Sequence, residues 1–237
     1  MTLHSAALTD IGLVRPENED SILRDDPERL YAVADGIGGL PSGAQASRAA
    51  VDTLDAWIRR RPPGPTVDYK ACLTEVNRVV HELGRALSPV YGIGSTLTAA
   101  HFLDDSVVVL HVGDSTLFRF RRGELDVLTV EHNLGNEIRQ RLARGESVAN
   151  FHENRSALTR CIGQPPPLAG DITTHPVLRG DRYVFCSDGI SRAVLAPELC
   201  RLLAETAEPM ALCRKLVARA NELGGLDNAS AVVVYVG

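Results

Sequence analysis

The chain has 237 residues, 44% of them hydrophobic, and a formal net charge of −5 at pH 7. This length suits one sizeable hydrophobic core and is short for two full domains, so we expect residues 1–237 to form a single domain. The acidic balance argues against nucleic acid or an anionic membrane as a main partner. No apolar run approaches the roughly 18 residues that a membrane span needs.

The N-terminus and the cysteines indicate the compartment. The opening Met1-Thr-Leu-His-Ser lacks the basic-then-apolar order of a signal peptide. The five cysteines are scattered and include no Cys-x-x-Cys pair, which is typical of reduced core thiols. We therefore expect a cytoplasmic protein.

Apolar residues recur at helical spacing in three segments, residues 42–61, 67–87 and 209–223. The last of these opens with proline and closes before Gly224, the expected asymmetry of helix caps. The intervening pattern is strand-like, and residues 117–127 predict a hairpin that turns at Arg122-Gly123. Because helices and strands do not alternate regularly, we expect antiparallel sheets with helices packed outside.

Residues 131–160 differ from their surroundings. Leu134, Ile138 and Leu142 predict a short helix that ends near Gly145, and polar residues follow. We interpret this segment as a flap over the surface. His132 and His152 lie in it and are the histidines that we favour for function, whereas His111 stands inside an apolar strand and is expected to be a core residue.

An apolar run that stops at an aspartate recurs along the chain. It occurs at Asp35, at Asp114 and at Asp188, and in inverted order at Asp227, which precedes the run 231–236. Four carboxylates at the ends of buried strands would be hard oxygen ligands on rigid supports. This donor set is typical of a site for Mg²⁺ or Mn²⁺.

A simpler interpretation exists for each Asp-Gly pair, since this pair is also a common hairpin turn. Residues 36–43 contain too many glycines for a two-residue turn, which favours a backbone carbonyl turned toward a cation. Gly94-Ser-Thr is followed by neither Gly-Lys nor the frame of a nucleophile elbow, which excludes both a P-loop and that type of serine hydrolase.

Arg15 stands beside three carboxylates, Glu17, Glu19 and Asp20. A charged run of this kind is commonly a solvated loop. Alternatively, the guanidinium binds a phosphate next to acids that support a metal. The residues alone leave both interpretations open.

Ordered motifs extend over residues 9–236. They are Asp10-x-Gly12-x-x-Arg15-x-x-Asn18-Glu19-Asp20, Ala32-Val-Ala-Asp35-Gly36-x-Gly38-Gly39, Gly94-Ser-Thr96, Val112-Gly-Asp114-Ser115, Ser187-Asp188-Gly189 and Gly225-x-Asp227-Asn228. In this order and over nearly the whole chain, they resemble the metal-dependent serine/threonine protein phosphatases (the PPM family, type 2C) of the bacterial branch.

The resemblance implies an α+β fold, a four-layer αββα sandwich of two antiparallel β-sheets flanked by helices, forming one phosphatase domain. It implies two Mn²⁺ or Mg²⁺ ions in a cleft at one end. Asp35 would bridge them, Gly36 would offer its carbonyl, and Asp188 and Asp227 would hold the first ion.

The resemblance also assigns more distant roles. Glu19 and Asp20 would act through bound waters, and Arg15 would hold the substrate phosphate. Asp114 would share a weaker third ion with Asp188, the alternative being that Asp114 caps a turn through Ser115.

The implied reaction is hydrolysis of phosphoserine or phosphothreonine by a water that the two ions activate, with catalytic residues Arg15, Asp35, Asp188 and Asp227. Phosphorylated proteins, the substrates of a Ser/Thr kinase, would be the partners of a monomeric enzyme. Two alternatives are a catalytically silent module that binds phosphoproteins or regulates a partner, and a hydrolase of small phosphoesters.

Five positions depart from the family pattern. Ile37 stands where relatives have methionine or histidine, Thr116 where arginine is common, and Glu131 where aspartate is usual. Ser230 replaces threonine, and Arg192 stands where some relatives have another carboxylate. None of these changes removes a direct ligand of the central pair of ions.

Overall fold

The computed structural model describes residues 1–38, 42–60, 67–147 and 154–237, and it contains two five-stranded antiparallel sheets. The first sheet has the order β1 (Leu3–Asp10), β10 (Ala229–Val236), β9 (Arg182–Cys186), β6 (Thr116–Arg121) and β7 (Glu124–Val127). The second has the order β2 (Asp20–Asp25), β3 (Leu30–Asp35), β4 (Leu97–Phe102), β5 (Ser106–Val112) and β8 (Asp171–Pro176).

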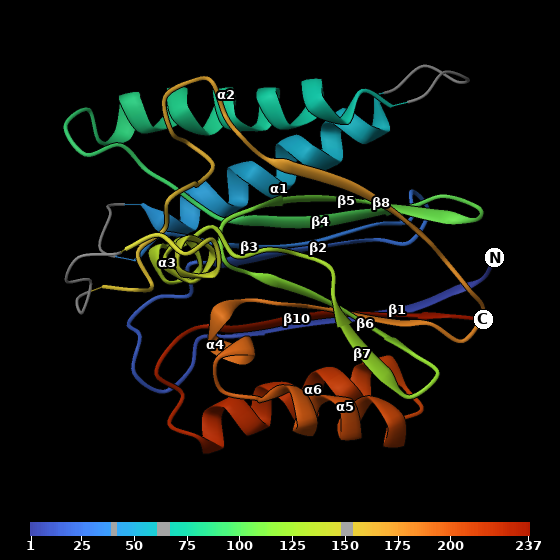
Figure 1. Cartoon of the computed structure of the whole chain (residues 1–237). Helices are drawn as coiled ribbons and strands as arrows, with labels where there is room; N and C mark the ends of the chain where they lie inside the picture. Colours follow the sequence, from blue (N-terminus) through green and yellow to red (C-terminus); the bar gives the residue numbers. More distant parts are fainter. Residues whose placement is uncertain (39–41, 61–66, 148–153) are drawn as a thin grey trace.

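Helices cover the outer face of each sheet (Figure 1). α1 (Gly43–Arg59) and α2 (Tyr69–Leu87) pack on the sheet that contains β3, whereas α5 (Ala196–Glu205) and α6 (Pro209–Glu222) pack on the sheet that contains β10. The short α4 (Asp188–Ser191) follows β9 directly. The predicted four-layer αββα sandwich is therefore confirmed.

The central strands are buried on both faces. In β10, Val232 and Val234 face the other sheet, and Val233 faces the helices. Between the sheets, the Tyr183 and Phe102 rings pack edge to face with their centroids 5.0 Å apart. Because side chains of a strand alternate between faces, neither sheet can slip by one residue without exposing its core. The ends of these strands are thus fixed supports.

The predicted helices agree closely with the structure. α2 begins at Tyr69 rather than at residue 67, because the Asp68 carboxylate caps it and accepts a hydrogen bond of 2.9 Å from the Ala71 amide. The hairpin of β6 and β7 is confirmed. Sequence analysis missed α5, although Pro197 near its start and the buried Leu199 and Leu203 are a helical signal.

All five cysteine thiols are free. Within the described part of the chain, no helix combines the length and the apolar character that crossing a membrane requires.

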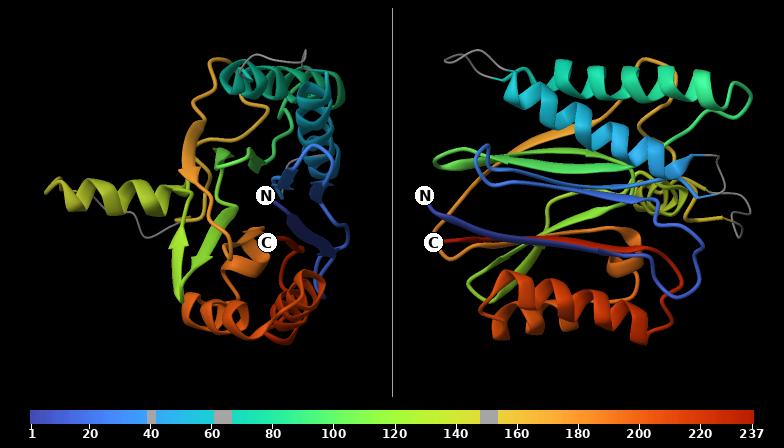
Figure 2. Two further views of the ribbon diagram at one scale, coloured as in Figure 1. Left: turned by 90° about the vertical axis from the view of Figure 1, so that its right-hand side faces the viewer. Right: turned by 180° about the vertical axis from the view of Figure 1, so that it is seen from behind.

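The predicted flap contains α3 (Leu134–Ala143), which projects from the body of the molecule (Figure 2). Gly135 is its one fully buried described residue, and Leu142 near its end is 56% exposed. Residues 148–153 of the flap, with His152, lie outside the described residues, as do Gly39 and Arg61.

We predict that α3 opens far more readily than the sandwich core, because it buries little apolar surface. In hydrogen exchange followed by mass spectrometry, amides of residues 134–143 should exchange at least about 100-fold faster than those of β5. Equal protection of the two segments would contradict a mobile flap.

Candidate metal centre

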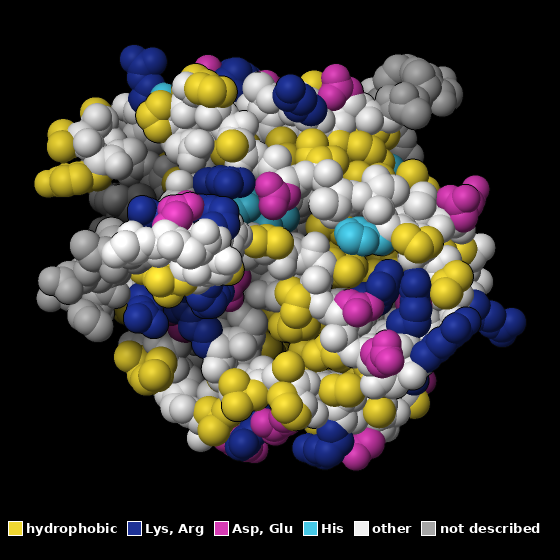
Figure 3. Space-filling model, in the orientation of Figure 1, with side chains coloured by type: hydrophobic (Ala, Val, Ile, Leu, Met, Phe, Trp, Pro, Cys, Tyr) yellow, Lys and Arg dark blue, Asp and Glu magenta, His cyan; other side chains and the backbone are white. Residues whose placement is uncertain are grey.

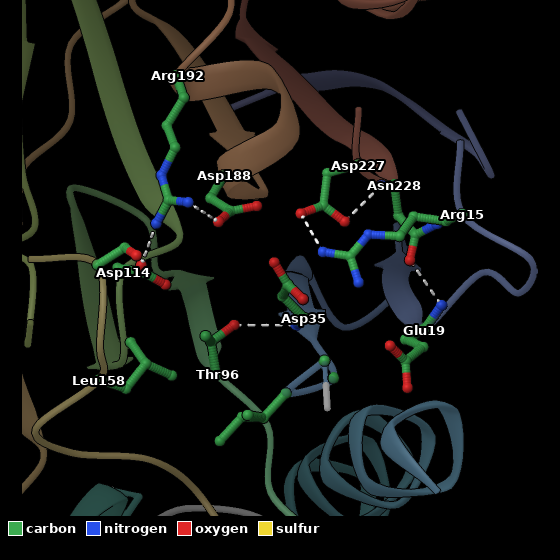
Figure 4. A pocket seen from close by; sticks show the side chains of 14 residues that line it. Arg15, Glu19, Asp35, Thr96, Asp114, Leu158, Asp188, Arg192, Asp227 and Asn228 are labelled. Carbon is green, nitrogen blue, oxygen red and sulfur yellow. Dashed lines mark hydrogen bonds and ion pairs between the residues drawn. The ribbon is translucent and has the colours of Figure 1, made fainter. Parts of the chain in front are cut away.

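Acidic side chains from both sheets meet in one cleft of about 180 Å³ at an end of the sandwich (Figure 4). Asp35 is the last residue of β3, and Asp114 follows β5 by two residues. Asp188 opens α4, and Asp227 precedes β10 by two residues. All four line the cleft, so the structure brings together the carboxylates that sequence analysis singled out.

Asp35 lies at the centre of this cluster and is firmly held. Its amide donates a hydrogen bond of 2.9 Å to Thr96 Oγ1, and the Thr96 amide donates one of 2.8 Å to the Asp35 carbonyl. Burial, followed by the charges of Asp20 and Asp188, raises the pKa of Asp35 well above its usual value. A cation beside this carboxyl group would stabilise its charged form and so lower its pKa again. Sequence analysis had quoted Thr96 in a motif without giving it a role.

Asp20 lies directly opposite Asp35 in the register of β2 and β3. Its two carboxylate oxygens are buried and make no regular hydrogen bond, although the Ser187 and Ser230 hydroxyls lie nearby. Burial raises the pKa of Asp20 to about 7. Buried oxygens without donors, next to other carboxylates, are what a hard divalent cation or its bound waters would satisfy.

The donor set therefore fits an Mg²⁺ or Mn²⁺ ion that keeps part of its water shell. Among the described residues, no three acidic, histidine or cysteine side chains converge closely enough to hold an ion by themselves. Mg²⁺ typically keeps several waters and binds through one or two carboxylates. A shell completed by a backbone carbonyl and water agrees with this preference.

Gly36 and Gly43 allow Glu19 to reach the cleft. A Cβ on Gly36 would lie 2.4 Å from the Gly43 backbone, and a Cβ on Gly43 would lie 2.2 Å from Glu19 Oε1. Either side chain would clash. The Glu19 carboxylate thus rests at the N-terminus of α1. Burial raises its pKa, and the Arg15 charge and the Gly43 amide oppose that rise, as expected at the positive end of a helix dipole.

Asn228 joins the N-terminal segment to the start of β10. Its Nδ2 donates hydrogen bonds of 2.9 Å to the Ile11 carbonyl and 3.0 Å to the Glu17 carbonyl. Its Oδ1 accepts one of 2.8 Å from the Glu19 amide. These bonds place Arg15 and Glu19 beside Asp227. Sequence analysis recorded Asn228 only as part of a motif, since its partners are remote in sequence.

Arg15 does not lie in a solvated loop remote from the cluster. Its Nη2 is 2.8 Å from Asp227 Oδ2, and the side chain lines the cleft while remaining 37% exposed. A guanidinium that is accessible and adjacent to the carboxylates can meet an anion that enters the cleft.

Arg192 lies across the cleft from Arg15 and contacts two carboxylates (Figure 4). Its Nη2 is 2.8 Å from Asp114 Oδ2, and its Nη1 is 2.7 Å from Asp188 Oδ2. Burial, then the Asp188 charge, raises the pKa of Asp114 to about 6, and Arg192 opposes that rise. Ser115 Oγ forms a hydrogen bond of 2.7 Å with Thr96 Oγ1, while the Asp114 carboxylate accepts its hydrogen bond from Arg192. The third ion expected at Asp114 therefore has a competitor.

The histidines that the structure describes lie outside the cleft. His111 is buried in β5, with Nδ1 2.9 Å from Thr98 Oγ1, as expected for a core residue. His132 is also buried, and its Nε2 is 3.2 Å from Asp171 Oδ2. None of the described residues that line the cleft is a histidine. The hypothesis of a functional histidine at His132 therefore receives no support from its position.

Comparisons with known proteins match the chain over nearly its whole length. The family model for protein phosphatase 2C matches residues 16–223. The protein phosphatase PhpP of Streptococcus pneumoniae is 29% identical over 234 residues, which are 96% of this chain and 95% of PhpP.

Solved structures give the same result. The PPM Ser-Thr phosphatase MsPP from Mycobacterium smegmatis, in complex with cacodylate, is 32% identical and has a TM-score of 0.84, with 100% of both chains covered. The catalytic domain of the serine/threonine phosphatase PstP, in complex with two manganese ions, is 30% identical. Its TM-score is 0.84, and the match covers 99% of this chain and 98% of that chain.

We predict that Asn228→Ala destabilises the fold, because three backbone groups lose their partner in a mostly buried place. The free energy of unfolding should fall by about 2–4 kcal/mol, measured by urea denaturation. Asn136→Ala, which removes hydrogen bonds in the projecting α3, is the matched control and should cost under about 1 kcal/mol. Equal losses in the two variants would show that Asn228 does not join these segments.

Proposed function

The chain belongs to the protein phosphatase 2C family and is a protein serine/threonine phosphatase, and we propose that it acts through two divalent ions, Mn²⁺ or Mg²⁺. The observation that carries this proposal is the cluster of carboxylates in a single cleft, where burial and then the charges of neighbouring carboxylates raise the pKa of Asp35. The solved relative with two manganese ions supports it.

Each acidic residue has a proposed part in holding the ions. Asp35 lies centrally and would contact both, with the Gly36 carbonyl beside it. Asp188 and Asp227 would hold the first ion with Asp35, after side-chain rotations that bring the three closer together than they lie in the structure. Glu19 and Asp20 would act through bound waters. Two such ions, when bound, lower the pKa of a shared water and align it for in-line attack on phosphorus.

Arg15 is the proposed contact for the substrate phosphate. Asp227 holds its guanidinium at the rim of the cleft, where planar N–H groups can bind two phosphate oxygens at once. This contact would orient the phosphate and offset its charge during transfer. Since no described histidine lines the cleft, we assign protonation of the leaving oxygen to water rather than to His132.

The surface near the cleft suits a phosphorylated protein as substrate. Basic side chains gather around α3 at this end of the sandwich (Figure 3), among them Arg139, Arg141 and Arg144. Each of these exposed guanidiniums pairs with Glu131 or Glu146, and exposed ion pairs are weak enough to exchange for a phosphorylated segment. We propose that the enzyme opposes a bacterial Ser/Thr kinase, while the cytoplasmic location and the monomeric state stay predictions from sequence. A catalytically silent module is disfavoured because every proposed metal carboxylate is present.

We predict that removal of divalent ions abolishes hydrolysis of a phosphothreonine peptide. Excess EDTA should lower the rate at least about 100-fold, because the attacking water is then no longer activated, and added Mn²⁺ should restore it. EDTA already saturated with Mn²⁺ is the control and should leave the rate unchanged. Full turnover in a sample shown by elemental analysis to lack metal would refute the metal mechanism.

We predict that Arg15→Ala weakens substrate binding more than metal binding. Loss of a charge-assisted contact worth about 1.5–3 kcal/mol should raise KM roughly 10-fold or more. Steady-state kinetics over a phosphopeptide titration measure this, and Mn²⁺ binding should change little. Arg201→Ala, which removes an exposed arginine paired with Glu205 on α5, is the matched control and should keep the original KM. Unchanged KM in Arg15→Ala would return Arg15 to the solvated-loop interpretation.

A further inference from the structure

We propose that the Arg192 guanidinium is a built-in cation at the outer end of the cleft, so that this chain binds two divalent ions and no third. This inference rests on the proposed two-ion function. It concerns the place between Asp114 and Asp188, where a further ion would need both carboxylates.

The backbone of α4 aims Arg192 at this place. The Arg192 amide donates a hydrogen bond of 2.9 Å to the Asp188 carbonyl, so the two residues stand one helical turn apart on the same face. The side chain then reaches Asp188 with one terminal nitrogen and Asp114 with the other, at 2.7 and 2.8 Å. One planar group therefore bridges a carboxylate attached to β9 and a carboxylate that follows β5, in opposite sheets.

The burial of the two carboxylates makes this bridge strong. Asp114 is 7% exposed and Asp188 14% exposed, whereas Arg192 is 52% exposed. The arginine thus covers two nearly buried charges and keeps its outer part in water. The contact with Asp114 is a charge-assisted hydrogen bond, a type that is among the stronger polar interactions in proteins, and the contact with Asp188 is an ion pair. A divalent ion in the same place would have to break both.

Arginine cannot be converted into a metal ligand at ordinary pH. Its guanidinium has no acceptor and stays protonated. A carboxylate at residue 192 would add a donor to the pair Asp114 and Asp188, but arginine adds a positive charge that repels a cation. Arg192 therefore disfavours a third ion in two ways: its guanidinium fills the place between the two carboxylates, and its charge repels a cation.

The charge balance of the cleft leads to the same conclusion. Among the described residues, the cleft is lined by five carboxylates and two guanidiniums, those of Arg15 and Arg192. Asp20 lies just behind as a sixth carboxylate. With all six ionised, two divalent ions and two arginines leave no net charge. A third divalent ion would leave a charge of about +2 in a partly desolvated cleft, which is unfavourable.

Arg192 also acts as a positioning residue for the first ion. Asp188 is a proposed ligand of that ion, and one of its oxygens is held by Arg192. The other oxygen can then turn toward Asp35 and Asp227, which lie beside it in the cleft (Figure 4). The arginine would thereby fix the ligand geometry while it neutralises Asp114.

The test counts bound Mn²⁺ per chain by calorimetry and by the electron paramagnetic resonance of free Mn²⁺. The wild-type chain and Arg192→Lys should saturate at two ions. Arg192→Ala should bind one more ion, at least about 10-fold more weakly than the tight pair, because Asp114 and Asp188 lose their counter-ion. Arg192→Ala combined with Asp114→Asn should return to two.

Arg139→Ala is the matched control, because Arg139 pairs with Glu131 beside the cleft and touches neither Asp114 nor Asp188. It should keep two ions. A third ion in the wild-type chain that Asp114→Asn removes would overturn the Arg192 proposal and leave the two-ion function intact. No gain of an ion in a folded Arg192→Ala, verified by circular dichroism and by its two tight sites, would also overturn it. If the wild-type chain binds no Mn²⁺, both proposals fail.

Discussion

The burial of several carboxylates beside one another is the constraint on which this end of the molecule depends. Asp20 and Asp35 face each other across adjacent strands, and Asp188 and Asp227 share their cleft. Each such charge costs several kcal/mol to bury without a partner. The cluster is therefore tolerable only with positive charge beside it. Arg15 and Arg192 supply part of that charge, and divalent ions are the proposed source of the rest.

The sandwich is what forces these groups together. Central strands such as β10 are buried on both faces, so packing between the sheets and against the helices determines where they end. Asp35 and Asp114 come from one sheet, and Asp188 and Asp227 from the other. Rigid supports of this kind hold the carboxylates in place before any ion binds, which lowers the reorganisation cost of binding and catalysis.

The two arginines of the cleft have different tasks because their partners differ. Arg15 contacts a single carboxylate at the rim and keeps donors for an incoming phosphate. Arg192 uses two nitrogens on two carboxylates and has less capacity for substrate. The family pattern alone would assign the Asp114 region to a weaker ion, and one substitution at residue 192 is enough to change that expectation.

The sequence by itself determined the local elements and the identity of the acids. These elements depend only on residues that are close in sequence, so they can be predicted before the fold is known. Examples are the helical spacing, the hairpin at residues 117–127 and the apolar run that ends at Asp35. Only the tertiary structure decided which distant groups touch. Arg192 and Asp114 are 78 residues apart, and Asn228 binds residues near the N-terminus. Such contacts depend on sheet packing, which periodicity along the chain does not encode.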